Sequence, residues 1–467
     1  MLNKFKSKKI SSKNKKLLQK KVTLPLHLQH INRMASGIDV GSTAHFVAVP
    51  EGCDEINVRE FSSFTSDLYA LADWLKQCKI ETIAMESTGV FWIPLFELLE
   101  SKGFDVKLVD ARNVKNVSGR KTDVLDCQWL QQLHTYGLLN GAFRPEELVC
   151  SLRVYIRQKS MLTKKAASHI QHMQKALSQM NLQLHNVIRD ITGDTGMSII
   201  REILAGQRDP KILAQHRDPR CKNPIEIIEK SLCGNYKEEH IFSLKQAVEL
   251  YDFYCNKMSA CDVEIEKILF KFEPKKEISE DHLKNHDLQK QSNSKNAPLF
   301  NVQAHLERIT GIDLTEIPGI NTITALIIIS EIGIDMGRWK DSKHFASWLG
   351  LCPGNKVSGG KRLGGAPSKK TSNRAAAALR TAANSLYRST SSLGAFLRRL
   401  KSRLGPMKAI TATAHKIAVI IYNMLKNGVG YIETGADYYE QQYKDRTIKN
   451  LKKRAKSLGF ELIAVAT

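Results

Sequence analysis

The chain lacks the features that mark secreted, zinc-ribbon and membrane proteins. Its nine cysteines include no Cys-x-x-Cys pair, so neither a zinc ribbon nor a disulfide framework is indicated, and separated thiols suit a reducing cytoplasm. The longest apolar run, near Ala325–Ile329, is far shorter than the ~20 residues of a membrane helix. The basic N-terminus has no apolar core of the kind found in signal peptides. These absences predict a soluble, cytoplasmic protein without a membrane partner.

Acidic residues are missing from two long stretches of the sequence. Residues 1–33 contain ten Lys and Arg, residues 342–432 contain sixteen, and neither stretch has an Asp or Glu. Together these cations exceed the net charge of +23. A surface that serves only solubility usually mixes both signs, so the segregation favours a polyanionic partner, DNA or RNA. A solvated basic surface is the alternative.

Residues 34–150 combine short strand patterns with amphipathic helix patterns, after a basic arm at 1–33. The order is three strands, then helix, strand, helix, strand and helix, which favours a mixed α/β sheet of the RNase H type, a RuvC-like domain. The expected strands lie in 37–50 (two), 56–63, 80–86 and 105–110, and the expected helices are 66–78, 91–100 and 123–136.

Residues 151–270 contain two heptad seams, which predict a helical coiled-coil region. The two seams can pack on each other as an antiparallel hairpin or can pair with a second subunit. Residues 271–305 are polar and are expected to form a linker. The first seam contains Ala166, Ile170, Met173, Leu177, Met180, Leu184, Val187 and Ile191, and the second contains Leu244, Val248, Tyr251, Cys255, Met258, Cys261, Ile265 and Ile268.

Residues 306–432 form a third, mainly helical pattern, and 433–467 read as a C-terminal tail. The segment 314–333 predicts helix, tight turn, helix, and Gly/Pro-rich loops follow from 350 to 367. Further helices are expected at 373–388 and near 407–426.

Four acidic residues of the α/β region are candidates for a metal site. Asp39 and Glu86 belong to strand patterns, whereas Asp123 and Asp126 are three residues apart and therefore share one face of a helix. Such a set can hold two divalent ions on a phosphodiester, and Mg²⁺ prefers carboxylate oxygens. Taken singly, each acid has an ordinary alternative as a turn residue, a strand end or a helix cap.

These motifs resemble those of a known family. GIDVG, MESTG and TDVLD, followed by IPGINTITA, GLCPGNKVSGGKR and NRAAAALR, are similar in kind and order to the DEDD transposases of the "IS one-ten" insertion-sequence group. The resemblance covers roughly residues 35–430. It implies that Asp39, Glu86, Asp123 and Asp126 form a metal-binding catalytic tetrad in a bacterial, nucleoid-associated enzyme.

The segment GNKVSGGKRLGG unites a serine with glycines and cations. Taken alone, Ser358 is most simply a turn residue, but the resemblance implies that it is the catalytic nucleophile, with Ser368 and Ser372 as rivals. Glycines permit close approach of the backbone to phosphate, and basic side chains supply charge. The candidate nucleic-acid contacts here are Gly359, Gly360, Lys361, Arg362, Lys369, Lys370, Arg374, Arg380 and Arg388.

The turn IPGINTITA is a candidate helix-hairpin-helix, whose backbone N–H groups would bind phosphate near Gly319. Asn321 replaces the usual second glycine, and we expect it to accept the left-handed backbone that such a turn needs. A plain glycine turn between core helices is the alternative.

The resemblance implies a recombinase that cuts and rejoins donor and target DNA, guided by a noncoding RNA and acting as a dimer or tetramer. A RuvC-type junction nuclease that uses metal-activated water is the nearest alternative. An actin-like or sugar-kinase ATPase needs a downstream Asp-Gly-Gly phosphate loop, which the sequence lacks. A non-catalytic nucleic-acid scaffold is a fourth hypothesis.

Overall fold

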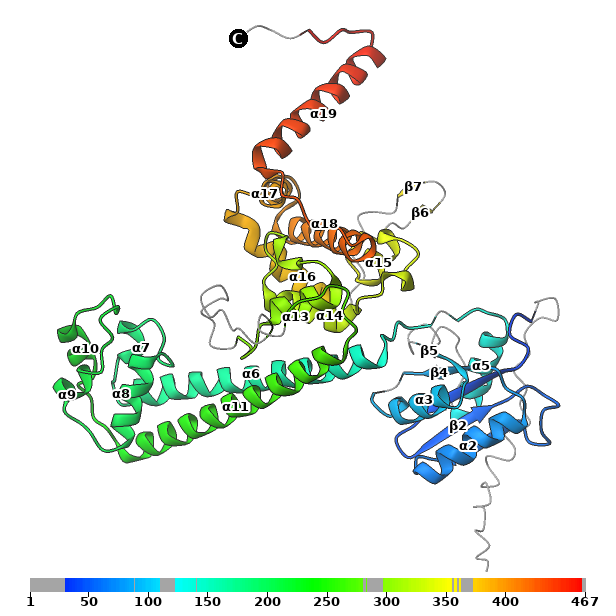
Figure 1. Cartoon of the computed structure of the whole chain (residues 1–467), viewed down its shortest axis with the longest axis horizontal. Helices are drawn as coiled ribbons and strands as arrows, with labels where there is room; N and C mark the ends of the chain where they lie inside the picture. Colours follow the sequence, from blue (N-terminus) through cyan, green and yellow to red (C-terminus); the bar gives the residue numbers. More distant parts are fainter. Residues whose placement is uncertain are drawn as a thin grey trace, which may run out of the picture. The chain divides into compact units, whose positions relative to one another are not determined.

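The computed structural model describes residues 30–87, 89–109, 122–139, 141–279, 283, 297–354, 357–358, 361–362 and 373–463. The chain divides into two compact units, and the boundary along the sequence falls between Arg144 and Pro145. The first unit is an α/β domain and the second is almost entirely helical (Figure 1). The expected boundary after residue 150 falls inside α6 (Glu147–Gln179), the first helix of the second unit. Most of the expected basic arm lies outside the described residues.

The first unit is built on a mixed five-stranded sheet, as the sequence predicted. The strand order is β3-β2-β1-β4-β5. Neighbouring strands pair antiparallel in β1–β2 and β2–β3 and parallel in β1–β4 and β4–β5. The strands are β1 (Ala35–Val40), β2 (Ala44–Ala48), β3 (Val58–Ser62), β4 (Thr82–Glu86) and β5 (Asp105–Val109).

Helices cover both faces of this sheet, and they are α2 (Thr65–Gln77), α3 (Trp92–Ser101) and α5 (Asp123–Thr135). Because side chains alternate along a strand, Ile38 and Val40 join the core formed with α2 and α3. Ala84 and Val109 point to the other face and pack against Trp129 of α5. The three helices and the five strands follow the predicted order.

The second unit begins with a long helical hairpin of α6 and α11 (Glu238–Lys271). Met173 shares a buried cluster with Leu244, while Leu162 shares another with Met258. As the residue numbers rise along α6, the numbers of the α11 residues that they contact fall, so the two helices are antiparallel. Of the two predicted arrangements, the structure therefore has the hairpin within one chain.

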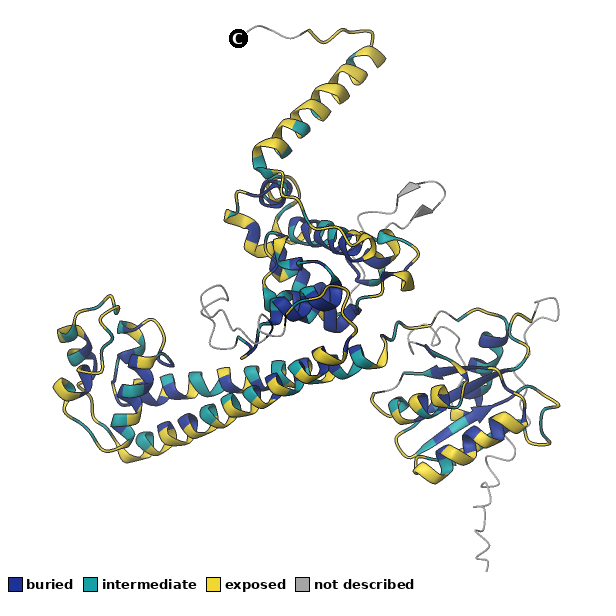
Figure 2. Ribbon diagram, viewed as in Figure 1, coloured by how far each residue is buried: buried dark blue, intermediate teal, exposed yellow. Residues whose placement is uncertain are grey.

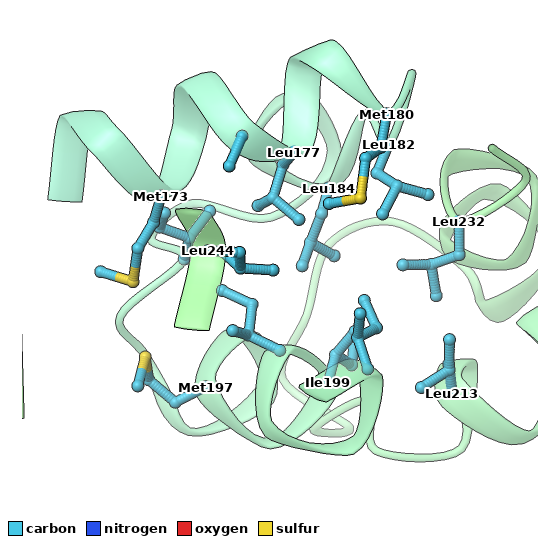
Figure 3. Packing of buried hydrophobic residues seen from close by; sticks show 14 of the residues in the cluster. Met173, Leu177, Met180, Leu182, Leu184, Met197, Ile199, Leu213, Leu232 and Leu244 are labelled. Carbon is cyan, nitrogen blue, oxygen red and sulfur yellow. The ribbon is translucent and has the colours of Figure 1, made fainter. Parts of the chain in front are cut away.

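The first heptad seam was predicted to continue through Ile191 as in a coiled coil, but its residues do not lie on one helix. Helix α6 ends at Gln179, and the chain turns at Asn181, whose backbone is left-handed (φ 60°). Of the later seam residues, Leu184 and Ile191 are still buried and Val187 is partly buried, in a cluster that covers the end of the hairpin (Figure 3). Four short helices carry this cluster with the hairpin: α7 (Leu184–Val187), α8 (Asp194–Leu204), α9 (Pro210–Ala214) and α10 (Ile225–Ser231).

The remaining helices form a C-terminal bundle around α14, in which Ile328–Ile332 are buried. Arg157 on α6 donates to both carboxylate oxygens of the buried Glu331 (2.9 and 2.7 Å), which ties the hairpin to this bundle. The elements are α13 (Val302–Thr310), η1 (Leu314–Glu316), α14 (Thr322–Ile332), η2 (Met336–Arg338), α15 (Ser342–Trp348), β6 (Val357–Ser358), β7 (Lys361–Arg362), α16 (Arg374–Ser385), η3 (Leu386–Arg388), α17 (Ser392–Leu404), α18 (Pro406–Asn427) and α19 (Gly435–Ser457).

Two parts of this unit differ from expectation. The segment expected as a C-terminal tail contains the 23-residue helix α19. Of the expected linker, residues 302–305 already belong to α13. Among the described residues, none of the helices has the length and apolar character needed to cross a lipid bilayer.

Candidate active site

Two of the predicted acids lie side by side at the carboxyl ends of neighbouring parallel strands. The register of β1 and β4 pairs Gly37 with Ala84 and Ile38 with Met85, so continuing it by one residue brings Asp39 beside Glu86. Both acids alternate with residues whose side chains enter the core under α2 and α3. Asp39 and Glu86 therefore face α5.

The other two acids lie in the first turn of α5. Asp123 is the first residue of this helix and is exposed, whereas Asp126 is half-buried. The residue preceding the helix is Thr122, so the alternative of Asp123 as the N-cap is wrong. Negative charge at a helix N-terminus is favourable because the helix dipole is positive there.

A glycine in β1 sets the distance between α5 and the sheet. A Cβ atom at Gly37 would lie 2.2 Å from the backbone N of Gln131 and 2.3 Å from the carbonyl O of Cys127. Only a residue without a side chain permits this backbone-to-backbone contact. Because Gly37 lies two residues before Asp39 on the same face, the contact also brings the first turn of α5 to the acidic strand ends.

The charges of the other three acids act on Asp39. Burial, together with the negative charges of Glu86, Asp123 and Asp126, raises the pKa of Asp39 from 3.8 to about 7. Like charges disfavour ionisation in this way only when they are close. The structure therefore places Glu86, Asp123 and Asp126 within electrostatic range of Asp39.

The donor set fits a hard divalent cation. A concentration of carboxylates that raises the pKa of one member would be relieved by positive charge, and carboxylate oxygens are the ligands that Mg²⁺ prefers. Within the described part of the chain, no three acidic, His or Cys side chains stand at metal-ligating spacing. The four acids are thus close enough to interact but have not converged on one point.

The serine segment is a small β-hairpin in the second unit. Strands β6 and β7 pair antiparallel, with Val357 opposite Arg362 and Ser358 opposite Lys361. The hairpin connects α15 to α16. Gly359, Gly360, Lys369 and Lys370 lie outside the described residues, as do the rival serines Ser368 and Ser372.

The predicted helix-hairpin-helix is only partly present. The turn has a single 3₁₀ turn, η1, before it and α14 after it. Gly319 has the left-handed backbone (φ 89°), and a Cβ there would meet Ala382 O at 2.7 Å. The expectation of a left-handed Asn321 is wrong, because its backbone is extended and its side chain accepts the backbone N–H of Thr324 (2.8 Å) as the N-cap of α14.

The three arginines expected on one helix have different environments. Arg374 is exposed at the start of α16, while Arg380 is half-buried and reaches Gly350 O at 3.5 Å. Arg388 is exposed but lies in η3, beyond the end of α16. The predicted continuous basic helix is therefore shorter than expected.

Comparison with known protein families gave two matches, one to each part of the chain that contains candidate site residues. A family model described as a transposase of the DEDD type, IS110, matches residues 36–182, and one described as "Transposase IS116/IS110/IS902 family" matches residues 313–398. The chain belongs to the IS110 family of DEDD transposases. The first match contains all four acids of the tetrad, and the second contains Ser358. A comparison with curated proteins gave no match. A transposase acts on DNA, and DEDD transposases generally use a divalent metal.

Sequence reasoning did not identify Gly37 as a residue of this transposase's site. It was noted only as part of the GIDVG motif, since its contribution comes from a missing side chain rather than from chemistry. Its place two residues before Asp39 in a strand is a usable signal, because residues i and i+2 share a face.

Proposed function

We propose that this transposase cuts and rejoins DNA with a metal-bound tetrad of Asp39, Glu86, Asp123 and Asp126 and with Ser358 as the nucleophile. The observation that carries the proposal is the burial of Asp39 among the negative charges of Glu86, Asp123 and Asp126, which together raise the pKa of Asp39 to about 7. The strand order and the helices on both faces of the sheet support an RNase H-like, RuvC-like domain beneath this site.

The four carboxylates would hold Mg²⁺, one ion or two. Bound there, the metal would draw negative charge from the scissile phosphate and stabilise the oxygens that enter and leave. Asp39 must release its proton before it can serve as a ligand. The site also needs α5 to lie close to β1, because Asp123 and Asp126 belong to α5 and must approach Asp39 from that helix.

Ser358 would carry the covalent step. Its hydroxyl oxygen forms a bond to phosphorus while the bond from phosphorus to the 3′ oxygen breaks, so the DNA keeps a 5′ phosphoserine link. The serine proton is lost and the released 3′ oxygen gains one. A 3′ hydroxyl of another strand then reverses the step and restores the serine. No external energy source is needed, because one phosphoester replaces another.

Nucleic acid would be held by the basic second unit. The candidate contacts near Ser358 fall in the stretch 342–432, where acids are absent, and the turn around Gly319 precedes this stretch. Resemblance to the family implies a guide RNA and a dimer or tetramer, in which tetrad and serine come from different subunits. The positive charge of residues 342–432, which is not mixed with acids, supports binding of a polyanion but does not distinguish RNA from DNA.

The alternative is a RuvC-type nuclease that hydrolyses DNA with water, since the tetrad suits that chemistry equally well. The decisive experiment uses duplex DNA with the ends of the element, in the presence of Mg²⁺. The proposal predicts that Ser358→Ala abolishes both cleavage and rejoining, while Ser368→Ala and Ser372→Ala remain active.

A water-using nuclease gives the opposite result. It would retain cleavage in Ser358→Ala and leave free 5′ phosphates. A scaffold without catalysis would show no cleavage even in the wild-type protein, and its nucleic-acid binding would be unchanged in Asp39→Asn.

A further inference from the structure

Helix α19 has no assigned role. It lies outside both ranges matched by the family models, 36–182 and 313–398. None of its side chains is buried, and it is exposed along nearly its whole length (Figure 2). A helix that buries nothing gains little from packing, so its exposed surface is available to a ligand.

The N-terminal half of α19 is nevertheless attached to the bundle. The guanidinium of Arg399 on α17 lies 3.6 Å from the ring centre of Tyr443, and the ammonium of Lys416 on α18 lies 5.2 Å from that of Tyr439. The backbone N–H of Gly435 donates to Glu433 (2.7 Å). These cation–π and capping contacts fix one end of the helix and leave the other end uncovered.

The uncovered half carries one continuous basic face. Residues 444–457 contain seven Lys and Arg and a single acid, Asp445. Lys449, Lys452, Lys453 and Lys456 are all exposed and follow the spacing i, i+3, i+4, i+7, which places them on one side of the helix. Such a row of cations matches the charge of a phosphate backbone.

A separate apolar stripe is too short to indicate a coiled coil with a second copy. It contains Ile448, Leu451 and Leu458, with Ala455 between the leucines, and one heptad step earlier is Lys444. Coiled coils require about three to four sustained heptads. The charge is therefore the stronger feature of this half of the helix.

We propose that α19 binds duplex DNA through its lysine face. An α-helix with side chains is about 10–12 Å wide, close to the ~12 Å major groove of B-DNA. The major groove of an RNA duplex is too narrow for it. The lysines contact phosphates rather than bases, so the interaction is independent of sequence and holds DNA that flanks the reacting site.

The test compares four full-length variants on an unrelated 30-bp duplex and on a hairpin RNA, in EDTA to prevent cleavage. The first variant changes Lys449, Lys452, Lys453 and Lys456 to Gln, and the second changes them to Arg. A charge-matched control changes Lys211, Lys222, Lys230 and Lys237, which are exposed near the end of the α6–α11 hairpin, to Gln. The fourth variant changes Ile448, Leu451 and Leu458 to Ser.

The glutamine variant of α19 is expected to bind the duplex at least tenfold more weakly. Its plot of log affinity against log salt should be shallower by about 3 to 4, since each lost phosphate contact removes about 0.9. The arginine variant, the hairpin control and RNA binding should change little.

Three results would overturn the proposal. One is an unchanged salt slope in the glutamine variant on duplex DNA. Another is an equal loss on hairpin RNA or in the charge-matched control. The third is a pair of observations: the variant with Ile448, Leu451 and Leu458 changed to Ser dissociates into single chains, and the glutamine variant binds the duplex normally. That result would show that α19 contacts a second copy of the chain.

Discussion

The acidic face of the sheet and the serine hairpin are built in different ways. The acids belong to β1, β4 and α5, elements whose neighbouring residues Ile38 and Met85 are fully buried. Ser358 belongs to a strand of two residues between α15 and α16. Carboxylates that share a metal need fixed separations, which regular elements supply. Ser358, in contrast, is identified by its sequence motif and by the basic residues around it, and not by a position on a long regular element.

The two regions also differ in charge. On the acidic face, burial and the negative charges of three neighbouring acids raise the pKa of Asp39 to about 7, whereas the stretch 342–432 around Ser358 has no acid at all. Each region therefore lacks the counter-charge that the other holds in excess. Under the proposed function, a divalent cation would supply it to the first region, and the phosphates of nucleic acid would supply it to the second.

The largest expected effect comes from substituting the acids, which should abolish cleavage without weakening the binding of DNA by the basic region. Asp39→Asn or Glu86→Gln is expected to reduce DNA cleavage by at least about a thousandfold, because the site loses a metal ligand. Duplex affinity in EDTA should stay within about twofold, since the basic stretch is untouched. Single-turnover cleavage and binding isotherms measure the two quantities.

Asp73→Asn is the matched control, because Asp73 is an exposed acid on α2 of the same unit. Equal losses of activity in Asp73→Asn and Asp39→Asn would refute a specific role for the tetrad.

The next effect concerns the scaffold under the acids. Gly37→Ala places a methyl group 2.2 Å from Gln131 N, so α5 must shift away from β1. We expect a loss of roughly 1–3 kcal/mol in the free energy of unfolding, together with weaker Mg²⁺ binding. Calorimetry on the full chain with and without Mg²⁺ measures both.

Gly141→Ala is the control, since a Cβ there meets only ordinary contacts, the nearest at 3.8 Å. Normal Mg²⁺ affinity in a folded Gly37→Ala variant would show that the position of α5 does not govern the site.

The pKa of Asp39 predicts a pH-dependent stability. The folded chain holds this proton up to about pH 7, whereas the ordinary value is 3.8, so the metal-free protein loses stability as pH rises between these values. Mg²⁺ competes with the proton, and its stabilisation should therefore grow over the same interval. It reaches about 2.7 kcal/mol when Mg²⁺ is at 100 times its Kd.

Thermal unfolding at pH 5 and pH 8, with and without Mg²⁺, checks this prediction. Asp39→Asn should remove the pH-dependent part of the response and Asp73→Asn should keep it. A response to Mg²⁺ as large at pH 5 as at pH 8 would contradict the assignment.

The smallest effect lies at the turn of the second unit. Asn321→Ala removes the N-cap of α14 and should cost about 1 kcal/mol of stability. Asn321→Asp keeps a capping oxygen but adds negative charge beside the proposed phosphate site, so we expect duplex affinity to fall a few-fold. Asn321→Ser, which caps without charge, should bind normally. Equal DNA affinity in all three variants would argue for a plain turn.

The sequence predicted the sheet because strand and helix patterns there are short, distinct and separated by turns. It predicted the tetrad because Asp39 and Glu86 mark strand ends and Asp123 and Asp126 share one helix face. It did not predict the end of α6 at Gln179, since heptad spacing continued through Ile191 and the turn at Asn181 left no strong signal.

Other features escaped prediction for different physical reasons. The role of Gly37 depends on a contact with α5, about ninety residues away in the chain. Asn321 was correctly placed at a turn, but the competing use of its side chain as a helix cap decided its backbone. Helix α19 was overlooked because its composition is polar, and polar segments usually lack a fixed structure.

The central claim is that the two regions act together to cut and rejoin DNA, and covalent trapping tests it most directly. Wild-type protein is incubated with Mg²⁺ and a nicked element-end duplex that cannot religate, then denatured, digested and analysed by mass spectrometry. The account predicts a peptide in which Ser358 carries the 5′ phosphate of the cleaved strand, absent in both Ser358→Ala and Asp39→Asn. Cleavage without any protein–DNA link, or a link at Ser368 or Ser372, would contradict it.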